Sequence, residues 1–312
     1  MKEYGDQLDE QWNKGEGEGP LIVDTTALHE AANENNPRVV RFLLDSLKSG
    51  ENSKAIKVML LAKDYNRQTA WHVAAAAGHI EMVENLWICA KAQLTAHELK
   101  NEYLLARDWT LSSAWHWAAK RGELEILVRL WDWAKELQLK PEELRNEVWL
   151  SKDDVDETAW QKAAGEGHVE LLEKMWDWAK ELQLKPEELR NELWLSKEDV
   201  DETAWHMASR KGYVEVLDKL WDWTKELQLK PEELRNGVLL SKNKYGVTAW
   251  NMAAGAGHAE VLEKLWDWAN ELQLKPDELR NEVCLSKDDV DETAWHMAAR
   301  GGLVDILKKL WN

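Results

Sequence analysis

Histidine is the residue of this chain best suited to proton transfer or metal binding, and eight of its nine histidines stand at two repeating positions. The first position follows an Ala-Trp or Ala-Leu pair, and the second follows a glycine. The first set is His29, His72, His116, His206 and His296, and the second set is His79, His168 and His258. Gln161 and Asn251 take the first position in two other units, and their amides donate hydrogen bonds but do not suit zinc. We therefore predict structural hydrogen bonds between repeats here, and no metal site.

Three acidic clusters could attract a cation or a basic protein. They span residues 153–157, 198–202 and 288–292, and we expect them to project along one edge of the fold and repel one another. A calcium loop needs oxygen ligands at fixed positions around a glycine and a closing glutamate, and these clusters lack that spacing. Two interpretations stay open. The clusters are either solvent-exposed charge that keeps the protein soluble or a docking ridge for a basic partner.

Residues that could act as nucleophiles or hold phosphate lack the surroundings that such chemistry needs. Cys89 and Cys284 form no metal-ligand pair, and the sequence places no histidine beside either one. The glycines of residues 15–19 lack phosphate-loop spacing, and no Gly-x-Ser-x-Gly motif occurs. We predict no catalytic site and no cofactor, so that an enzyme is the least favoured class.

Charge and hydropathy narrow the class of protein further. The 312 residues carry a formal net charge of −18, which disfavours binding to nucleic acid or to an anionic membrane surface. No run approaches the roughly 18 apolar residues of a membrane span, and the first residues do not resemble a secretory signal. We expect a monomeric, cytoplasmic protein.

A repeat must position all of these residues, and the tripeptide Thr-Ala-Trp sets its period. It begins at Thr158, Thr203, Thr248 and Thr293, 45 residues apart, an earlier copy begins at Thr69, and looser copies begin at Thr26 and Ser113. The stretch 133–146 recurs unchanged at 178–191. Near-identical units share one backbone geometry, so we expect equivalent side chains to line up in rows.

The unit that starts at Ser113 predicts two helices. Ser113 suits the N-cap of a short first helix, and Gly122 suits its end. Over residues 124–137 the apolar side chains fall within an arc of roughly 160°, with Trp131 and Trp133 at its two borders. The chain has 21 tryptophans, and we predict that these Trp pairs pack between neighbouring repeats.

A third, short helix and a turn complete the unit. Pro141 is predicted to stop the second helix and to start a new one, and an earlier unit has a capping box, Thr95 with Glu98, at this place. The polar turn that follows, in which Asp, Asn or Gly246 can adopt left-handed angles, is expected to project as a finger.

The segment from Thr69 to Trp87, with Thr-Ala-Trp-His, paired alanines, Gly-His and an amphipathic helix, resembles the ankyrin repeat. The resemblance covers about residue 20 to the C-terminus and implies an all-α ankyrin-type solenoid of about seven helical repeats joined by fingers. Each repeat would have a lengthened second helix and a short extra helix. The family's proline is alanine here, some of its leucines are tryptophan, and its finger glycine is replaced by Asp156, Asp201, Asp291 and Leu111. A HEAT-like array has a similar period but explains the placement of Thr-Ala-Trp-His and Gly-His poorly.

The expected domain organisation is a polar tail and one repeat array. Residues 1–19 are rich in Gly and Glu and read as a flexible tail, and residues 20–312 form the array. Repeats open near residues 26, 69, 113, 158, 203, 248 and 293, and the last one is truncated.

The charge is uneven between repeats. Residues 203–247 carry a net charge of +2, between neighbouring units of −6 and −7, and Lys244 and Tyr245 occupy the finger of this unit. We interpret it as a recognition spot for an acidic segment.

Ankyrin repeats bind proteins through finger tips and first helices, so the resemblance implies a protein-interaction module or scaffold. The predicted partner contacts are Lys120, Arg121, Asp154, Asp156, Asp199, Asp201, Arg210, Lys211, Lys244, Tyr245, Asp289, Asp291 and Arg300. The alternative is a divalent-cation or small-ligand carrier that uses the acidic fingers. A calorimetric calcium titration would distinguish the two functions, since a specific cation site would give a saturable isotherm.

Overall fold

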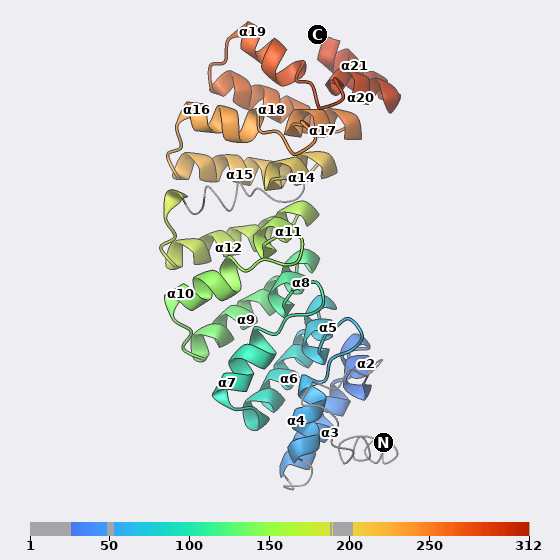
Figure 1. Ribbon diagram of the computed structural model, residues 1–312, viewed down its shortest axis with the longest axis vertical. Helices are drawn as coiled ribbons and strands as arrows, with labels where there is room; N and C mark the ends of the chain where they lie inside the picture. The colour runs from blue at the N-terminus through green and yellow to red at the C-terminus, as the bar shows by residue number, and fades with distance from the viewer. Residues whose placement is uncertain (1–25, 49–52, 188, 190–201, 312) are drawn as a thin grey trace. The chain divides into compact units, whose positions relative to one another are not determined.

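The computed structural model describes residues 26–48, 53–187, 189 and 202–311, so the predicted tail over residues 1–19 lies outside the described part. The chain divides into two compact units, unit 1 over residues 1–143 and unit 2 over residues 144–312. Both units are built from stacked helical pairs (Figure 1).

Unit 1 stacks three helical pairs and their connecting helices. First helices α2, α5 and α8 lie side by side in one row, and second helices α3, α6 and α9 lie in another (Figure 1). The elements are α2 (Ala27–Asn33), α3 (Pro37–Lys48), α4 (Ser53–Leu61), α5 (Ala70–Ala76), α6 (Ile80–Gln93), α7 (Ala96–Glu98), the π-helix η1 (Leu99–Leu104), α8 (Ala114–Arg121), α9 (Leu124–Glu136) and α10 (Pro141–Glu143).

Unit 2 repeats the same arrangement. First helices α11, α14, α17 and α20 form one row, and second helices α12, α15, α18 and α21 form the other. The elements are η2 (Leu144–Trp149), α11 (Ala159–Glu166), α12 (Val169–Glu181), α14 (Ala204–Lys211), α15 (Val214–Glu226), α16 (Pro231–Leu234), η3 (Arg235–Leu239), α17 (Ala249–Ala256), α18 (Ala259–Glu271), α19 (Pro276–Glu278), η4 (Leu279–Cys284), α20 (Ala294–Arg300) and α21 (Val304–Trp311).

Local signals set the ends of the first helices as predicted. Every predicted opening residue, from Thr26 to Thr293, is the N-cap of a helix. Gly122 ends α8 in the left-handed conformation at φ +77°, which glycine adopts without a steric penalty. The predicted first and lengthened second helices are therefore confirmed in both units.

The Trp pairs of the second helices pack between neighbouring repeats, as predicted. In unit 2, Trp176 stacks on Trp223 with ring centroids 5.0 Å apart, and Trp221 stacks on Trp268 at the same distance. In unit 1, Trp87 stacks on Trp133 at 4.8 Å. In each stack the first aromatic position of one repeat faces the second position of the next, so the pairs bury apolar surface across repeat boundaries.

The predicted short third helix is present, but it continues as a π-helix that the sequence analysis did not foresee. The capping box holds, since the Thr95 amide donates to Glu98 Oε2 at 3.0 Å and the Glu98 amide donates to Thr95 Oγ1 at 3.3 Å. In η1, Leu99, Tyr103 and Leu104 are all buried. A spacing of four and five residues fits one face of the wider π turn, which is why these segments leave α geometry.

The prediction that proline stops the second helices was wrong. Helix α9 ends at Glu136, five residues before Pro141, and Gln138 adopts a left-handed φ of +57°. The Leu139 amide then donates to the carbonyl of Ala134 at 3.2 Å, and the Leu139 side chain is buried. This is the hydrogen bond and apolar contact of a Schellman motif, so packing of Leu139 ends the helix. Gln183, Gln228 and Gln273 have the same conformation.

One buried hydroxyl breaks the pattern of the first helices and gives a stability prediction. Ser209 in α14 is fully buried and its Oγ has no hydrogen-bond partner, whereas equivalent positions hold alanines such as Ala164. A buried unpaired hydroxyl costs about 1–3 kcal/mol, and alanine also favours the helix. Ser209→Ala is therefore expected to stabilise the protein by about 1 kcal/mol in urea denaturation followed by circular dichroism.

Ala164→Ser is the matched control for this prediction, because it places the same hydroxyl at the equivalent buried position of α11. It should destabilise the protein by a similar amount. A loss of stability in Ser209→Ala would show that the hydroxyl is paired after all.

Candidate functional site

The fingers that join the repeats have one internal geometry, built on an Asp or Asn at their second residue. The described fingers are residues 63–68, 107–112, 152–157, 242–247 and 287–292. In the finger at 152–157, Asp153 Oδ1 accepts the amides of Val155 at 3.1 Å and Glu157 at 2.8 Å. The same two bonds occur at Asp64, Asp108, Asn243 and Asp288. The carboxylate or amide thus holds a hairpin whose next two residues form the tip.

Left-handed backbone angles complete each finger, as predicted for Asp and Gly. Asp156 has φ +60°, Asp291 has φ +63° and Gly246 has φ +73°. Leu111 has φ +53°, so this unit keeps the finger conformation without a residue that favours it. Asp201 lies outside the described residues.

The expectation that the acidic clusters project in full was wrong for Asp153. Its side chain is 5% exposed, accepts hydrogen bonds from the finger backbone and pairs with Lys162, which also binds Glu157. Asp154 and Asp156 are exposed, and so are Asp289 and Asp291. The predicted contacts Asp199 and Asp201 lie outside the described residues.

The finger at 242–247 presents the predicted cation and aromatic. The Lys244 amine lies 5.1 Å from the centroid of the Tyr245 ring, and Tyr245 is 54% exposed. The next finger is acidic and packs directly against this one, because the Asp289 amide donates to the Tyr245 carbonyl at 3.0 Å. A ligand at Lys244 would therefore also meet the carboxylate of Asp289.

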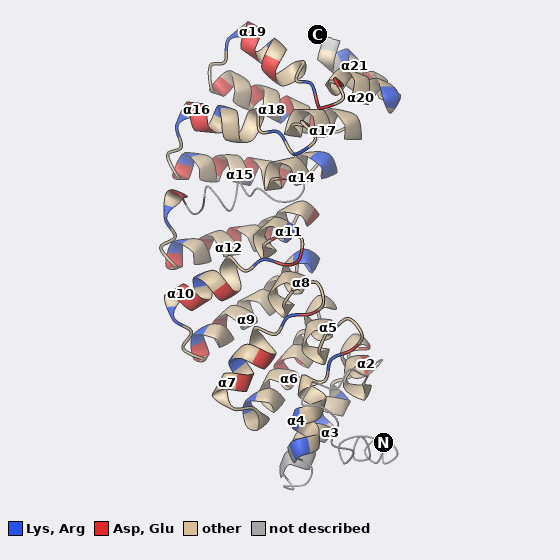
Figure 2. Cartoon of the chain, in the orientation of Figure 1, with Lys and Arg blue, Asp and Glu red and all other residues tan. Residues whose placement is uncertain are grey.

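The predicted cations of the first helices lie at helix C-terminal ends, where the helix dipole favours positive charge (Figure 2). Arg210 pairs with Glu202 at 3.2 Å, Lys211 lies 3.6 Å from Glu166, and Arg300 pairs with Glu292. In unit 1 the Lys120 amine lies 5.6 Å from the Trp117 ring. Arg121, the last residue of α8, is exposed. The cations of the three pairs in unit 2 are about half-exposed or more. Exposed ion pairs are weak, so these cations stay available to a partner.

The histidines of the first position make structural hydrogen bonds, as predicted, but they reach carbonyls of their own repeat and not of a neighbour. The bonds between repeats come from the second position, where His79 Nε2 lies 3.1 Å from the Asn33 carbonyl and His258 Nε2 lies 3.0 Å from the Arg210 carbonyl. His72 Nδ1 lies 2.9 Å from Thr69 Oγ1, and its Nε2 lies 2.9 Å from the carbonyl of Ala106, just before the finger that closes the same repeat. His206 reaches the Ser241 carbonyl at 3.1 Å, and Asn251 makes the equivalent bond to Ser286 at 3.1 Å. Burial lowers the pKa of both His72 and His206 to about 4, so these imidazoles are neutral at pH 7. Both ring nitrogens of each are taken up by hydrogen bonds within the protein.

The cysteines are poorly suited to nucleophilic chemistry. Cys89 in α6 is fully buried and Cys284 at the end of η4 is partly buried. Burial raises the pKa of both thiols to about 11, so little thiolate forms at neutral pH. Within the part of the chain that the structure describes, no three His, Cys, Asp or Glu side chains gather as a metal site.

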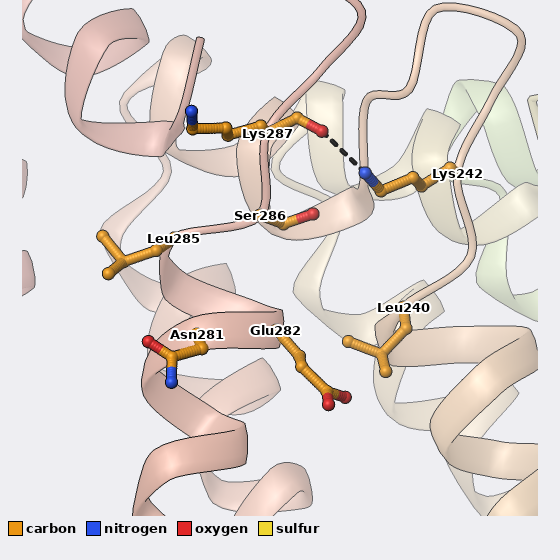
Figure 3. A pocket seen from close by; sticks show the side chains of 7 residues that line it. All are labelled: Leu240, Lys242, Asn281, Glu282, Leu285, Ser286 and Lys287. Atoms are coloured by element: carbon orange, nitrogen blue, oxygen red, sulfur yellow. Dashed lines mark hydrogen bonds between the residues drawn. The ribbon is translucent and has the colours of Figure 1, made fainter. Parts of the chain in front are cut away.

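A surface cleft of about 370 Å³ lies beside η4 (Figure 3). Its charged groups are engaged in the protein, since Lys242 donates to the Lys287 carbonyl at 2.6 Å and Lys287 pairs with Asp291 at 3.1 Å. Glu282 in the same cleft pairs with Arg235. The cleft therefore offers little convergent polarity to a small ligand.

Sequence reasoning missed two exposed aromatics at the finger tips of unit 1. Trp109 is 70% exposed and Tyr65 is 67% exposed. Each directly follows the Asp that holds its finger, and this position in the Asp-led turn is the signal that could have found them.

A family model described as "Ankyrin repeats (3 copies)" matches residues 11–98. Ankyrin repeats are thus detected in residues 11–98, and the fold of the described residues is an all-α ankyrin-type solenoid. The predicted count of seven repeats stays a prediction. No curated protein matches the chain. Across the described residues, no helix is both long and apolar enough to span a bilayer. Ankyrin repeats are generally protein-interaction modules and typically not enzymes.

Proposed function

We propose that this chain is an intracellular scaffold that binds a partner protein through its finger tips and the exposed ends of its first helices. One observation carries the proposal: side chains at the finger tips differ from repeat to repeat while the framework beneath them is nearly constant. The tips of unit 2 present Asp154 and Val155 in one finger and Lys244 and Tyr245 in another. The Asp or Asn that holds each turn is kept throughout the described fingers. Such a surface can vary its contacts without loss of stability.

Charge reversal at the cationic spot of unit 2 tests this proposal. Lys244→Glu combined with Arg210→Glu should lower capture of partner proteins severalfold, because both cations are exposed and lie outside the core. The measurement is quantitative mass spectrometry of proteins that the chain captures from cells, after chemical crosslinking. Thermal melting of the variant should show only a small loss, since Arg210→Glu removes one exposed ion pair and a favourable interaction with the C-terminal end of α14.

Lys230→Glu is the matched control, since Lys230 is an exposed lysine at the N-cap of α16, away from the fingers. The control should capture the same proteins as the unaltered chain. Equal capture by the double variant and the unaltered chain would remove this spot from the proposed contact surface.

A further inference from the structure

The two fingers of unit 1 at residues 63–68 and 107–112, here called the aromatic fingers, are neighbours that each carry an exposed aromatic at the tip. Of the other described fingers, the one at 242–247 also carries an exposed aromatic, Tyr245. The tips of the aromatic fingers carry Tyr65 and Trp109, exposed at 67% and 70%. Leu111 in the second of them is half-exposed. In a chain whose Trp pairs are buried between repeats, an indole held in solvent by a well-bonded turn is a candidate contact for another molecule.

The aromatic fingers are fixed relative to each other. The Trp109 amide donates to the Asn66 carbonyl at 2.8 Å, and Gln68 Nε2 donates to Asp108 Oδ2 at 3.0 Å. Asp108 Oδ2 also accepts the indole N–H of Trp117 at 2.8 Å. Tyr65 and Trp109 are thus carried on two turns that are bonded together, so little conformational entropy remains to be lost when a ligand binds.

Cations flank the exposed rings. Lys63 is the first residue of the finger at 63–68, and Arg67 is its fifth. Arg107 is the first residue of the finger at 107–112 and is therefore equivalent to Lys63. Among the described residues, no carboxylate lies within ion-pair distance of Lys63 or Arg67. The Arg107 guanidinium donates to the Leu111 carbonyl at 3.1 Å, so the guanidinium lies against its own finger.

Lys63 and Arg67 repel each other. Partial burial lowers the pKa of Lys63, and the neighbouring charge of Arg67 lowers it further, while Glu102 on η1 partly opposes them. Asp64 and Asp108 use their oxygens on the backbone and on Gln68, Thr110 and Trp117. An added carboxylate would relieve the repulsion between Lys63 and Arg67.

We infer that the aromatic fingers bind an acidic peptide segment that also carries large apolar side chains. Carboxylates of the segment would pair with Lys63 and Arg67, and its apolar side chains would pack on Tyr65 and Trp109. The acidic fingers present Asp154 and Asp289 and would repel such a segment. The finger at 242–247 carries a single aromatic and packs against Asp289, so the paired aromatic fingers of unit 1 are the favoured place. At physiological ionic strength the Debye length is about 8 Å, so distant acidic charges of the chain are largely screened. This inference rests on the proposed function, since it names the partner chemistry of one part of the finger surface.

Selection of random peptides displayed on phage against the full chain tests the inference. The enriched peptides should hold an excess of Asp and Glu beside Leu, Ile, Phe or Tyr. A fluorescein-labelled copy of an enriched peptide then gives a Kd by anisotropy. Trp109→Ala, and separately Lys63→Glu with Arg67→Glu, should each weaken this Kd at least tenfold without changing the helical circular dichroism. Arg67→Lys, which keeps the charge, should retain most of the affinity.

Several outcomes would overturn the inference. These are the absence of enriched peptides, enriched peptides without acidic excess, and a Kd unchanged within twofold in both variants. Tighter binding of a polythymidine oligonucleotide at the same residues would assign the surface to nucleic acid instead. Peptides lost with Lys244→Glu but not with Trp109→Ala would refute the inference while leaving the proposed function in place. Failure of the proposed function would show separately, as no protein captured from cells by the unaltered chain above the level of a bead-only control.

Discussion

Trp223→Ala is expected to destabilise unit 2 by about 4 kcal/mol. The Trp223 side chain in α15 is 6% exposed and contacts two indoles of the preceding repeat, with centroid distances of 5.0 Å to Trp176 and 5.1 Å to Trp160. Truncation of a buried Trp to Ala costs about 3–5 kcal/mol, because apolar burial is lost and a cavity remains. The cavity would lie between repeats, where neighbouring repeats in a solenoid depend on each other for their core.

Urea denaturation followed by circular dichroism measures this loss. Trp109→Ala provides the matched control, since the same side chain is removed from an exposed finger tip of unit 1, and a change within about 0.5 kcal/mol is expected. A loss of less than 1 kcal/mol in Trp223→Ala would mean that the indole does not support the repeat boundary.

Acidification from pH 6.5 to pH 5 is expected to remove about 2 kcal/mol of stability for each of His72 and His206. Burial lowers the pKa of both to about 4 in the folded protein, whereas an unfolded histidine titrates near 6.5. Between these values the unfolded chain binds protons that the folded protein excludes, so stability falls as the pH falls. Each pKa unit corresponds to about 1.4 kcal/mol. The stabilising effect is fully present above pH 6.5 and is lost as the pH falls toward 4.

Another repeat of the chain already has asparagine at the position of His206, which suggests a matched variant. Asn251 takes the histidine position in α17, where it accepts from Thr248 Oγ1 at 3.2 Å and donates to the Ser286 carbonyl. His206→Asn should therefore fold at pH 7 and lose less stability on acidification. Denaturation midpoints between pH 7 and pH 5 give the comparison. Parallel pH curves for the variant and the unaltered chain would show that His206 does not drive the acid effect.

Features that depend on residue type within one repeat could be predicted from the sequence. The opening Thr and Ser residues cap helices, Gly122 ends one, and the interchange of His206 and Asn251 identified a hydrogen-bonding position. The tryptophans at the borders of the apolar stripe indicated contacts on both sides of each second helix. These signals are local or periodic, so a single sequence reveals them.

Features set by tertiary packing could not be predicted in the same way. Gln138 has no strong preference for left-handed angles, and the burial of Leu139 imposes its conformation. The π-helix η1 forms because three side chains spaced by four and five residues are buried together. Asp153 looked like one more exposed charge, and only the hydrogen bonds of the folded finger show that it holds the turn.

The candidate site was predicted in part for a related reason. Charged residues such as Lys244 and Arg210 were found because they interrupt an acidic background. Trp109 was hidden among many tryptophans, and only its exposure separates it from the buried pairs.

A double-mutant cycle across Trp176 and Trp223 tests the central claim, namely that stacked indoles join neighbouring repeats into the framework that presents the fingers. The rings are nearly parallel, with an interplanar angle of 19°. Aromatic pairs of this kind couple by about 0.5–1.5 kcal/mol beyond their burial. The account predicts that Trp176→Leu and Trp223→Leu together destabilise the protein by about 1 kcal/mol less than the sum of the single changes. Strictly additive effects of the two changes would contradict it.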